Sequence, residues 1–111
     1  MTTLYLAFAN PAQGREAEFL DWYEHTHVPD LLTTPGFISA RRFALHPRSA
    51  AILPPPPQRY LVIYEIDSDI ETAMSHIAAK VESGEIVLTD AMDMSSVAMS
   101  FWEALGPTVS A

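Results

Sequence analysis

Arg59-Tyr-Leu-Val-Ile-Tyr-Glu-Ile66 is the clearest strand of the chain. Every second residue from Tyr60 to Ile66 is apolar, and Leu61 and Ile63 between them are apolar as well. Because side chains alternate between the faces of a sheet, both faces of this strand are suited to burial. We therefore expect residues 59–66 to form a central strand.

The residues after this strand predict a helix and a last strand. Ser68 and Glu71 have the spacing of a capping box, and Gly84 suits the left-handed residue that ends a helix. A strand is expected near Val97, Met99 and Phe101, ending before Gly106. The pattern of residues 85–95 fits a short strand as well as a turn, so the sequence leaves the structure of this segment open.

The segment before the central strand is rich in proline. Residues 47–58 hold five prolines, four of them consecutive at 54–57, which predicts an exposed loop with polyproline character and no helix. A proline-rich recognition ligand is the alternative interpretation. Residues 37–46 precede this loop and are expected to form a strand, with Phe37, Ser39, Arg41, Phe43 and Leu45 on one face.

The N-terminal part predicts a strand and a helix. Residues 4–9 are apolar at every position, which favours a strand buried on both faces. Phe19, Trp22, Tyr23 and His27 then have helical spacing, and Pro29 is expected to kink or end this helix. Pro35-Gly36 is typical of a turn.

The resulting order, β-α-β-β-α-β, is that of a ferredoxin-like α+β fold. It places an antiparallel sheet under two helices on one face, within a single domain over residues 1–111. The other sheet face would then expose many apolar side chains. We therefore expect a homodimer in which two sheets pack face to face.

Composition excludes several classes of protein. The net charge of −8 disfavours binding to nucleic acid, and the absence of cysteine excludes disulfides and thiolate chemistry. No basic residue precedes the first apolar run, and no apolar run approaches the roughly 20 residues that span a bilayer. We expect a cytoplasmic protein that does not bind membranes.

His27 is the strongest candidate for chemistry, because it continues the sheet-facing side of the first helix. An imidazole in a partly apolar cleft can move a proton near neutral pH, although a structural hydrogen bond beside Pro29 is the simpler role. His25 and His27 lie on opposite sides of a helix, so the pair does not predict a metal site.

Other polar residues are weaker candidates. Asp30 could orient His27 or cap a turn, and Glu65 could act as a buried acid or pair with an arginine. Arg41 and Arg42 face opposite sides of their strand, so only one of them can reach a given cleft, and it would suit a substrate carboxylate.

Tyr23-x-x-x-His27-x-Pro29, followed by Pro35-Gly36-Phe37, resembles the EthD-like branch of the dimeric α+β barrel superfamily. The resemblance implies a sheet-to-sheet dimer with a cleft between helices and sheet in each protomer, into which His27 points. Members of the superfamily include lactone isomerases, polyketide cyclases, cofactor-free monooxygenases and haem-binding branches. The resemblance therefore implies a fold and a site but not one reaction.

We predict a small enzyme without a cofactor, in which His27 is the acid or base for an isomerase- or cyclase-like proton transfer. Its substrate would be a lactone, an enol or an aromatic polyketide-like molecule. The alternatives are a non-catalytic dimer that binds a hydrophobic small molecule, a haem-binding protein and a monooxygenase. The expected binding residues are Trp22, Tyr23, Asp30, Arg41, Phe43, Tyr64 and Glu65.

Overall fold

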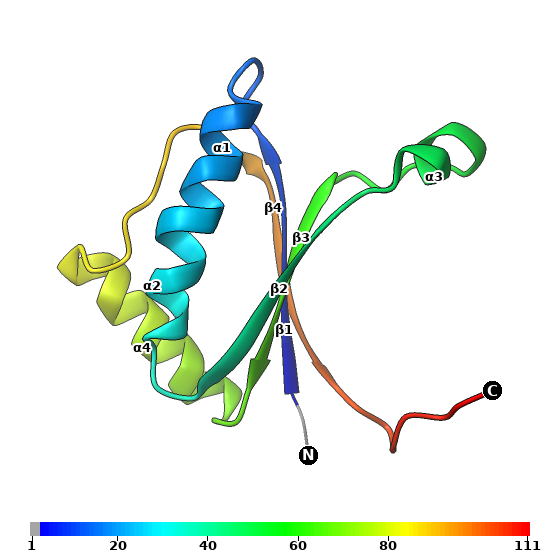
Figure 1. Cartoon of the computed structure of the whole chain (residues 1–111). Helices are drawn as coiled ribbons and strands as arrows, with labels where there is room; N and C mark the ends of the chain where they lie inside the picture. The colour runs from blue at the N-terminus through cyan, green and yellow to red at the C-terminus, as the bar shows by residue number, and fades with distance from the viewer. Residues whose placement is uncertain (1–2) are drawn as a thin grey trace.

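A computed structural model describes residues 3–111, which form one antiparallel sheet with its long helices on one face (Figure 1). The elements are, in chain order, β1 (Thr3–Pro11), α1 (Glu16–Trp22), the π-helical turn η1 (Tyr23–His27), α2 (Val28–Leu32), β2 (Phe37–Ala44), α3 (Pro47–Ile52), β3 (Tyr60–Ile66), α4 (Ile70–Ser83) and β4 (Met92–Glu103).

The sheet has the strand order β2-β3-β1-β4, so β1 and β3 are the central strands. In its register Tyr5 of β1 lies opposite Tyr64 of β3 and Phe101 of β4. All three pairings of neighbouring strands are antiparallel. The predicted ferredoxin-like α+β fold is confirmed, and the expected central strand at residues 59–66 is β3.

The hydrophobic core lies between the sheet and the helices. The strand residues that point toward the helices are buried, among them Tyr5, Val62, Tyr64 and Ile66. Phe19 of α1 belongs to the same buried cluster and contributes from the helical layer. Alternate strand residues point to the opposite face, where Phe43 and Trp102 remain 40% and 57% exposed. The sheet therefore has one packed face and one face that no other described segment covers.

The first helix continues through Pro29 instead of ending before it. Its three segments follow one another directly, and the widened turn η1 ends two residues before the proline, with the Val28 N–H donating to the Tyr23 carbonyl. Pro29 has no N–H for an ordinary helical bond. The π-turn accommodates the missing N–H of Pro29 without a break in the helix. His27 is the last residue of this turn.

β2 contains an irregularity that changes its predicted face. Phe37 pairs with Ile66 while Ser39 pairs with Glu65, so Ile38 is an extra residue in the ladder. Phe37 therefore points toward the helices, whereas Ser39, Arg41 and Phe43 point to the open face. The prediction that Phe37 shares their face was wrong for this reason.

Two further expectations needed correction, and one choice that the sequence left open is decided. Residues 47–52 form helix α3, because Pro47 occupies the first helical turn, where a missing N–H costs nothing. Asp69 rather than Ser68 caps α4, and its carboxylate accepts from the Thr72 N–H at 2.7 Å. Residues 85–91 form the turn before β4, and β4 itself begins at Met92.

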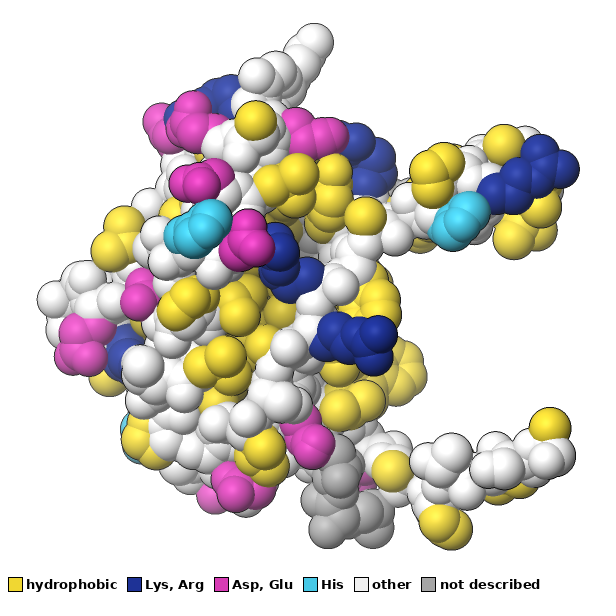
Figure 2. Space-filling model, in the orientation of Figure 1, with side chains coloured by type: hydrophobic (Ala, Val, Ile, Leu, Met, Phe, Trp, Pro, Cys, Tyr) yellow, Lys and Arg dark blue, Asp and Glu magenta, His cyan; other side chains and the backbone are white. Residues whose placement is uncertain are grey.

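Two segments project from the sheet on the side away from the long helices. One is the β2–β3 connection with α3, and the other is the C-terminal tail after β4 (Figure 1). The space-filling view shows a hollow between them, with hydrophobic side chains on the sheet side (Figure 2). Among residues 3–111, no helix is both long and apolar enough to cross a membrane.

Candidate functional site

A cleft of about 200 Å³ lies between the sheet and the helical layer. Its floor comes from β1, β3 and β4, one side from η1 and α2, and the other from α4 and the turn before β4. The side chains that line it are mainly apolar and include Tyr5, Tyr23, His27, Leu31, Tyr64, Ile77, Ile86, Met92 and Met99. Such a lining suits a small hydrophobic molecule.

His27 is the one histidine that lines this cleft. Its ring stacks on Trp22 with centroids 4.4 Å apart and meets Tyr23 edge-on at 5.4 Å. Its Nδ1 atom is buried and has no hydrogen-bond partner among the described residues. A structural hydrogen bond between His27 and a backbone carbonyl beside Pro29 was expected from the sequence. Within residues 3–111, no such bond forms at Nδ1.

Burial lowers the pKa of His27 from 6.5 to about 4, and the negative charge of Asp30 opposes this shift only in part. The imidazole is consequently neutral at pH 7. A neutral imidazole has one nitrogen that accepts a proton and one that donates. One ring nitrogen of His27 is therefore unprotonated at pH 7 and can accept a proton.

Tyr64 adds a second polar atom to the cleft. Its side chain is fully buried, and its hydroxyl has no partner among the described residues. Burial raises its pKa well above the ordinary value, so the hydroxyl keeps its proton. Nearby, the Tyr5 hydroxyl donates to the Met99 Sδ atom at 2.7 Å. Tyr64 is therefore the tyrosine of this pair whose O–H has no hydrogen-bond partner among the described residues.

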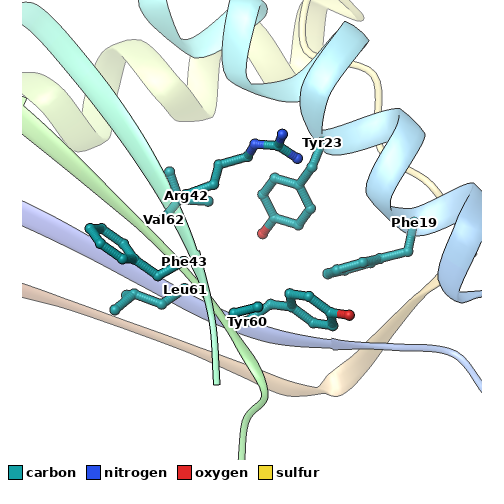
Figure 3. A pocket seen from close by; sticks show the side chains of 8 residues that line it. Phe19, Tyr23, Arg42, Phe43, Tyr60, Leu61 and Val62 are labelled. Carbon is teal, nitrogen blue, oxygen red and sulfur yellow. The ribbon is translucent and has the colours of Figure 1, made fainter. Parts of the chain in front are cut away.

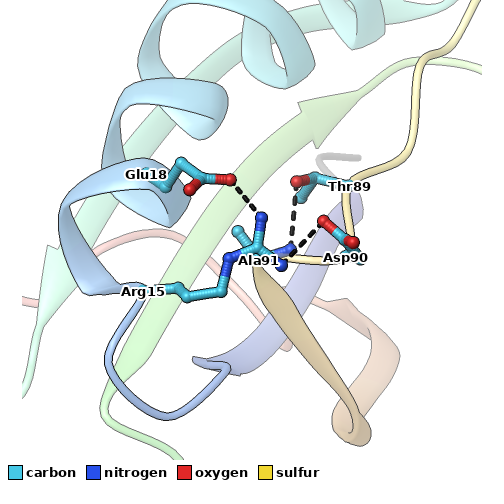
Figure 4. Close-up of polar contacts among 5 residues, drawn as sticks. All are labelled: Arg15, Glu18, Thr89, Asp90 and Ala91. Carbon is cyan, nitrogen blue, oxygen red and sulfur yellow. Dashed lines mark hydrogen bonds and ion pairs between the residues drawn. The ribbon is translucent and has the colours of Figure 1, made fainter.

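The turn before β4 is tied to the first helix at both ends. The Trp22 Nε1–H donates to the Val87 carbonyl at 2.8 Å, directly behind the His27 ring. Arg15 binds Asp90 at 2.8 Å and also pairs with Glu18 (Figure 4). These contacts hold Ile86 and Leu88 over the cleft.

A second pocket of about 230 Å³ lies on the other side of Tyr23, between α1 and the ends of β2 and β3 (Figure 3). Its walls include Phe19, Tyr23, Tyr60 and Val62. Arg42 reaches across it toward the helix, and its Nη2 atom lies 3.6 Å from Glu24 Oε1. Tyr23 is the residue that both pockets share.

The structure brings together only some of the predicted site residues. Tyr23 and Tyr64 line the cleft with His27, and Trp22 supports the His27 ring from behind. Asp30 lies one turn beyond, where its backbone carbonyl accepts from Thr33 Oγ1 at 2.8 Å and from Lys80 Nζ at 3.2 Å.

Arg41, Phe43 and Glu65 are placed elsewhere, because their strand positions direct them to the open face of the sheet. Arg41 lies over the Phe43 ring at 5.4 Å, and Phe43 also borders the second pocket. The arginine on the helix-facing side is Arg42. The sequence left the choice between the two arginines open, and the irregularity at Ile38 decides it.

Sequence reasoning missed the methionines of the cleft. Met92, Met94 and Met99 line it, and their flexible thioethers suit an adaptable apolar wall. The alternation of Val97, Met99 and Phe101 was a signal for Met99. Met92 and Met94 lay in the segment that the pattern did not resolve. Within residues 3–111, no cluster of three or more His, Asp or Glu residues could hold a metal ion.

Comparison with known proteins gives structural matches only. No family model matches the sequence, and no curated protein matches it. The structure is similar to that of an ethyl tert-butyl ether D (EthD) family protein from Bacillus halodurans C-125, with a TM-score of 0.65 and 16% identity over 95% of this chain and 100% of that chain.

Two further solved structures have the same architecture. One is a MhuD variant with two manganese protoporphyrin IX molecules bound per active site, at a TM-score of 0.65 and 14% identity over 97% of this chain and 99% of that chain. The other is a monooxygenase from the gene ActVA-Orf6 of Streptomyces coelicolor in complex with nanaomycin D, at a TM-score of 0.55 and 12% identity over 99% and 92%. The chain therefore shares the ferredoxin-like α+β fold of these proteins, as its sequence predicts.

Proposed function

We propose that the cleft binds a hydrophobic small molecule and that His27 moves a proton on it, without a cofactor. The observation that supports this most is the unpartnered, buried Nδ1 of His27 in an apolar cleft. Buried polar atoms of folded proteins nearly always have partners. A ligand with a carbonyl or enol oxygen would supply the missing one.

A proton transfer requires a ligand that offsets the effect of burial, because a pKa of about 4 makes the neutral His27 a weak base. The neutral imidazole would take a proton from a carbon beside a carbonyl group, which leaves an enolate and an imidazolium. The negative charge of the enolate would then stabilise the imidazolium of His27. It would replace the stabilisation by water that burial removes. The Tyr64 O–H could donate to the enolate oxygen. Return of the proton to another carbon would complete an isomerisation, with no net oxidation or reduction.

Binding without chemistry is the second candidate, and one observation favours it. Among the described residues that line the cleft, His27 is the only side chain that offers a basic nitrogen at neutral pH, and none is a carboxylate. Isomerases commonly divide the work between an acid and a base. A cleft with one such group can hold a ligand even where it does not transform it.

The residues present do not fit haem in this conformation. At about 200 Å³ the cleft is smaller than the roughly 300–1,000 Å³ of drug-size sites, and a porphyrin is larger than most drugs. We therefore derive no chemistry through an iron centre.

We further propose that two copies associate through their open sheet faces. This face carries the apolar side chains of β1 and β3 that point away from the helices, Leu4, Leu6, Phe8, Leu61 and Ile63. The two projecting segments lie on the same side and border the hollow (Figure 2). A second sheet would cover a surface that is otherwise open to water.

Hydrogen exchange tests the proton-transfer proposal without knowledge of the natural substrate. The protein would be incubated in D2O with α-angelica lactone and, separately, with 1-tetralone, which both carry acidic C–H groups beside a carbonyl. Loss of these C–H signals in NMR spectra reports proton removal. We expect catalysed exchange of at least one probe, and its loss in His27→Gln.

The control is His25→Gln, which removes the exposed histidine of the same helix and should leave exchange unchanged. Equal exchange with the wild type and His27→Gln would contradict the proposed role. If both probes bind but exchange only at the rate of free solution, the cleft is a binding site.

A further inference from the structure

The pocket beside Arg42 has the features of a second ligand site, and it does not depend on the function proposed for the His27 cleft. The aromatic rings of Phe19, Tyr23 and Tyr60 enclose it, and they come from three elements, α1, η1 and the distant strand β3. Figure 3 shows the Tyr23 hydroxyl directed into the space between the labelled side chains. The pocket therefore combines an apolar wall with polar groups at defined positions.

Arg42 provides the charged group of this pocket. Its guanidinium carries five N–H donors, and among the described residues its one ionic partner is Glu24 at 3.6 Å. Both side chains of this pair are well exposed, at 39% and 57%, so water screens the pair and Glu24 can turn away. A planar guanidinium with unused donors is suited to binding a carboxylate with two parallel hydrogen bonds.

The size of the pocket limits the ligand. At about 230 Å³ it is below the roughly 300 Å³ at which drug-size sites begin, so it suits a single ring with a short substituent. We propose that this pocket binds a small aromatic carboxylate, with the carboxylate on Arg42 and the ring among Phe19, Tyr23 and Tyr60.

The charges around the pocket also predict its selectivity. On the helix side of the pocket, Arg42 lies opposite Glu24. At the Tyr60 end, Glu16 forms an ion pair with Arg59 at 3.2 Å. The protein as a whole carries a net charge of −8, which repels anions without a matching cation. A carboxylate should therefore bind only where Arg42 is present, and a dianion should bind less well than a monoanion.

The test is calorimetric titration of the whole protein with cinnamate and with its uncharged amide, cinnamamide. We expect cinnamate to bind more tightly than cinnamamide. In Arg42→Gln, cinnamate affinity should fall about ten- to a hundredfold, because a charge-assisted pair of hydrogen bonds is lost. Cinnamamide affinity should change little in this variant. Arg48→Gln makes the same change of charge on α3 and should leave both affinities unchanged.

A second variant separates this pocket from the His27 cleft. Leu88 lines only the cleft, so Leu88→Trp should fill part of the cleft and leave cinnamate affinity unchanged. Amide NMR shifts on cinnamate addition should lie at the ends of β2 and β3. The proposal is overturned if cinnamate fails to bind, if the amide binds as tightly, if Arg48→Gln weakens binding as much as Arg42→Gln does, or if Leu88→Trp abolishes binding.

Discussion

His27 and Tyr64 are two buried polar residues whose surroundings explain the proposed chemistry. Each has an unpartnered polar atom, and each is held in its neutral form by burial. Helical spacing predicted that His27 faces the sheet, and strand alternation predicted that Tyr64 is buried. The absence of hydrogen-bond partners could not be predicted, because it depends on which groups the tertiary fold brings within about 3 Å.

Tyr64→Phe should leave the free energy of unfolding unchanged or raise it by up to about 1 kcal/mol. A buried hydroxyl without a partner costs desolvation free energy that phenylalanine does not pay. Urea unfolding followed by fluorescence measures this difference. In the same measurement Tyr5→Phe should lower stability by about 0.5–1 kcal/mol, because it removes the contact with Met99 Sδ. A loss above about 1 kcal/mol in Tyr64→Phe would show that its hydroxyl has a partner in the folded state.

At the scale of the elements, regular strands were easier to predict than irregular ones. The alternation in residues 60–66 fixes β3, and Gly84 ends α4 in the left-handed conformation that the sequence predicts. The π-turn before Pro29 and the extra residue at Ile38 were not predicted. Both insert one residue into a regular pattern, and the free energy that decides their position comes from tertiary packing.

Gly36, in the turn before β2, should be the most sensitive glycine of the chain. Its φ of 89° is in the left-handed region, and a Cβ placed there would lie 2.6 Å from Ser68 Oγ. Gly36→Ala should therefore lower the free energy of unfolding by about 2–5 kcal/mol, from backbone strain and steric overlap together. Chemical denaturation provides the measurement.

Gly14→Ala is the matched control for backbone strain. Gly14 has a similar φ of 76°, but a Cβ there would meet no atom within 4 Å. Its cost should be about 1–2 kcal/mol. Equal losses in the two alanine variants would mean that the turn at Gly36 moves away from Ser68.

The whole molecule has a packed side and an open side, and the open side explains why both faces of its strands are apolar. The sequence predicted this sheet and its uncovered face from the two-sided pattern of β1 and β3. It did not predict the two projecting segments beside that face. A run of four prolines excludes an α-helix or a central strand but does not determine the direction in which the chain leaves the sheet.

Leu6→Lys should separate the proposed dimer. Leu6 lies on β1 between Ile63 and Ser100 and points to the open face, so a lysine there would be buried without a partner in a sheet-to-sheet dimer. Light scattering should give twice the 12.3 kDa chain mass for the wild type and the chain mass for Leu6→Lys. Met74→Lys changes an exposed methionine on α4 and should remain dimeric. A wild type that is monomeric at micromolar concentration would contradict the proposed association.

The pKa of His27, measured by NMR titration of its ring signals, tests the proposed site most directly. We predict a value near 4 for the free protein, well below the 6.5 of an exposed imidazole. The folded protein then binds fewer protons than the unfolded chain between these values, so His27 should also lower stability as the pH falls through this range. A ligand that becomes an enolate should raise the pKa. A value near 6.5 in the free protein would show that His27 is solvated, and would contradict a buried neutral base in an apolar cleft.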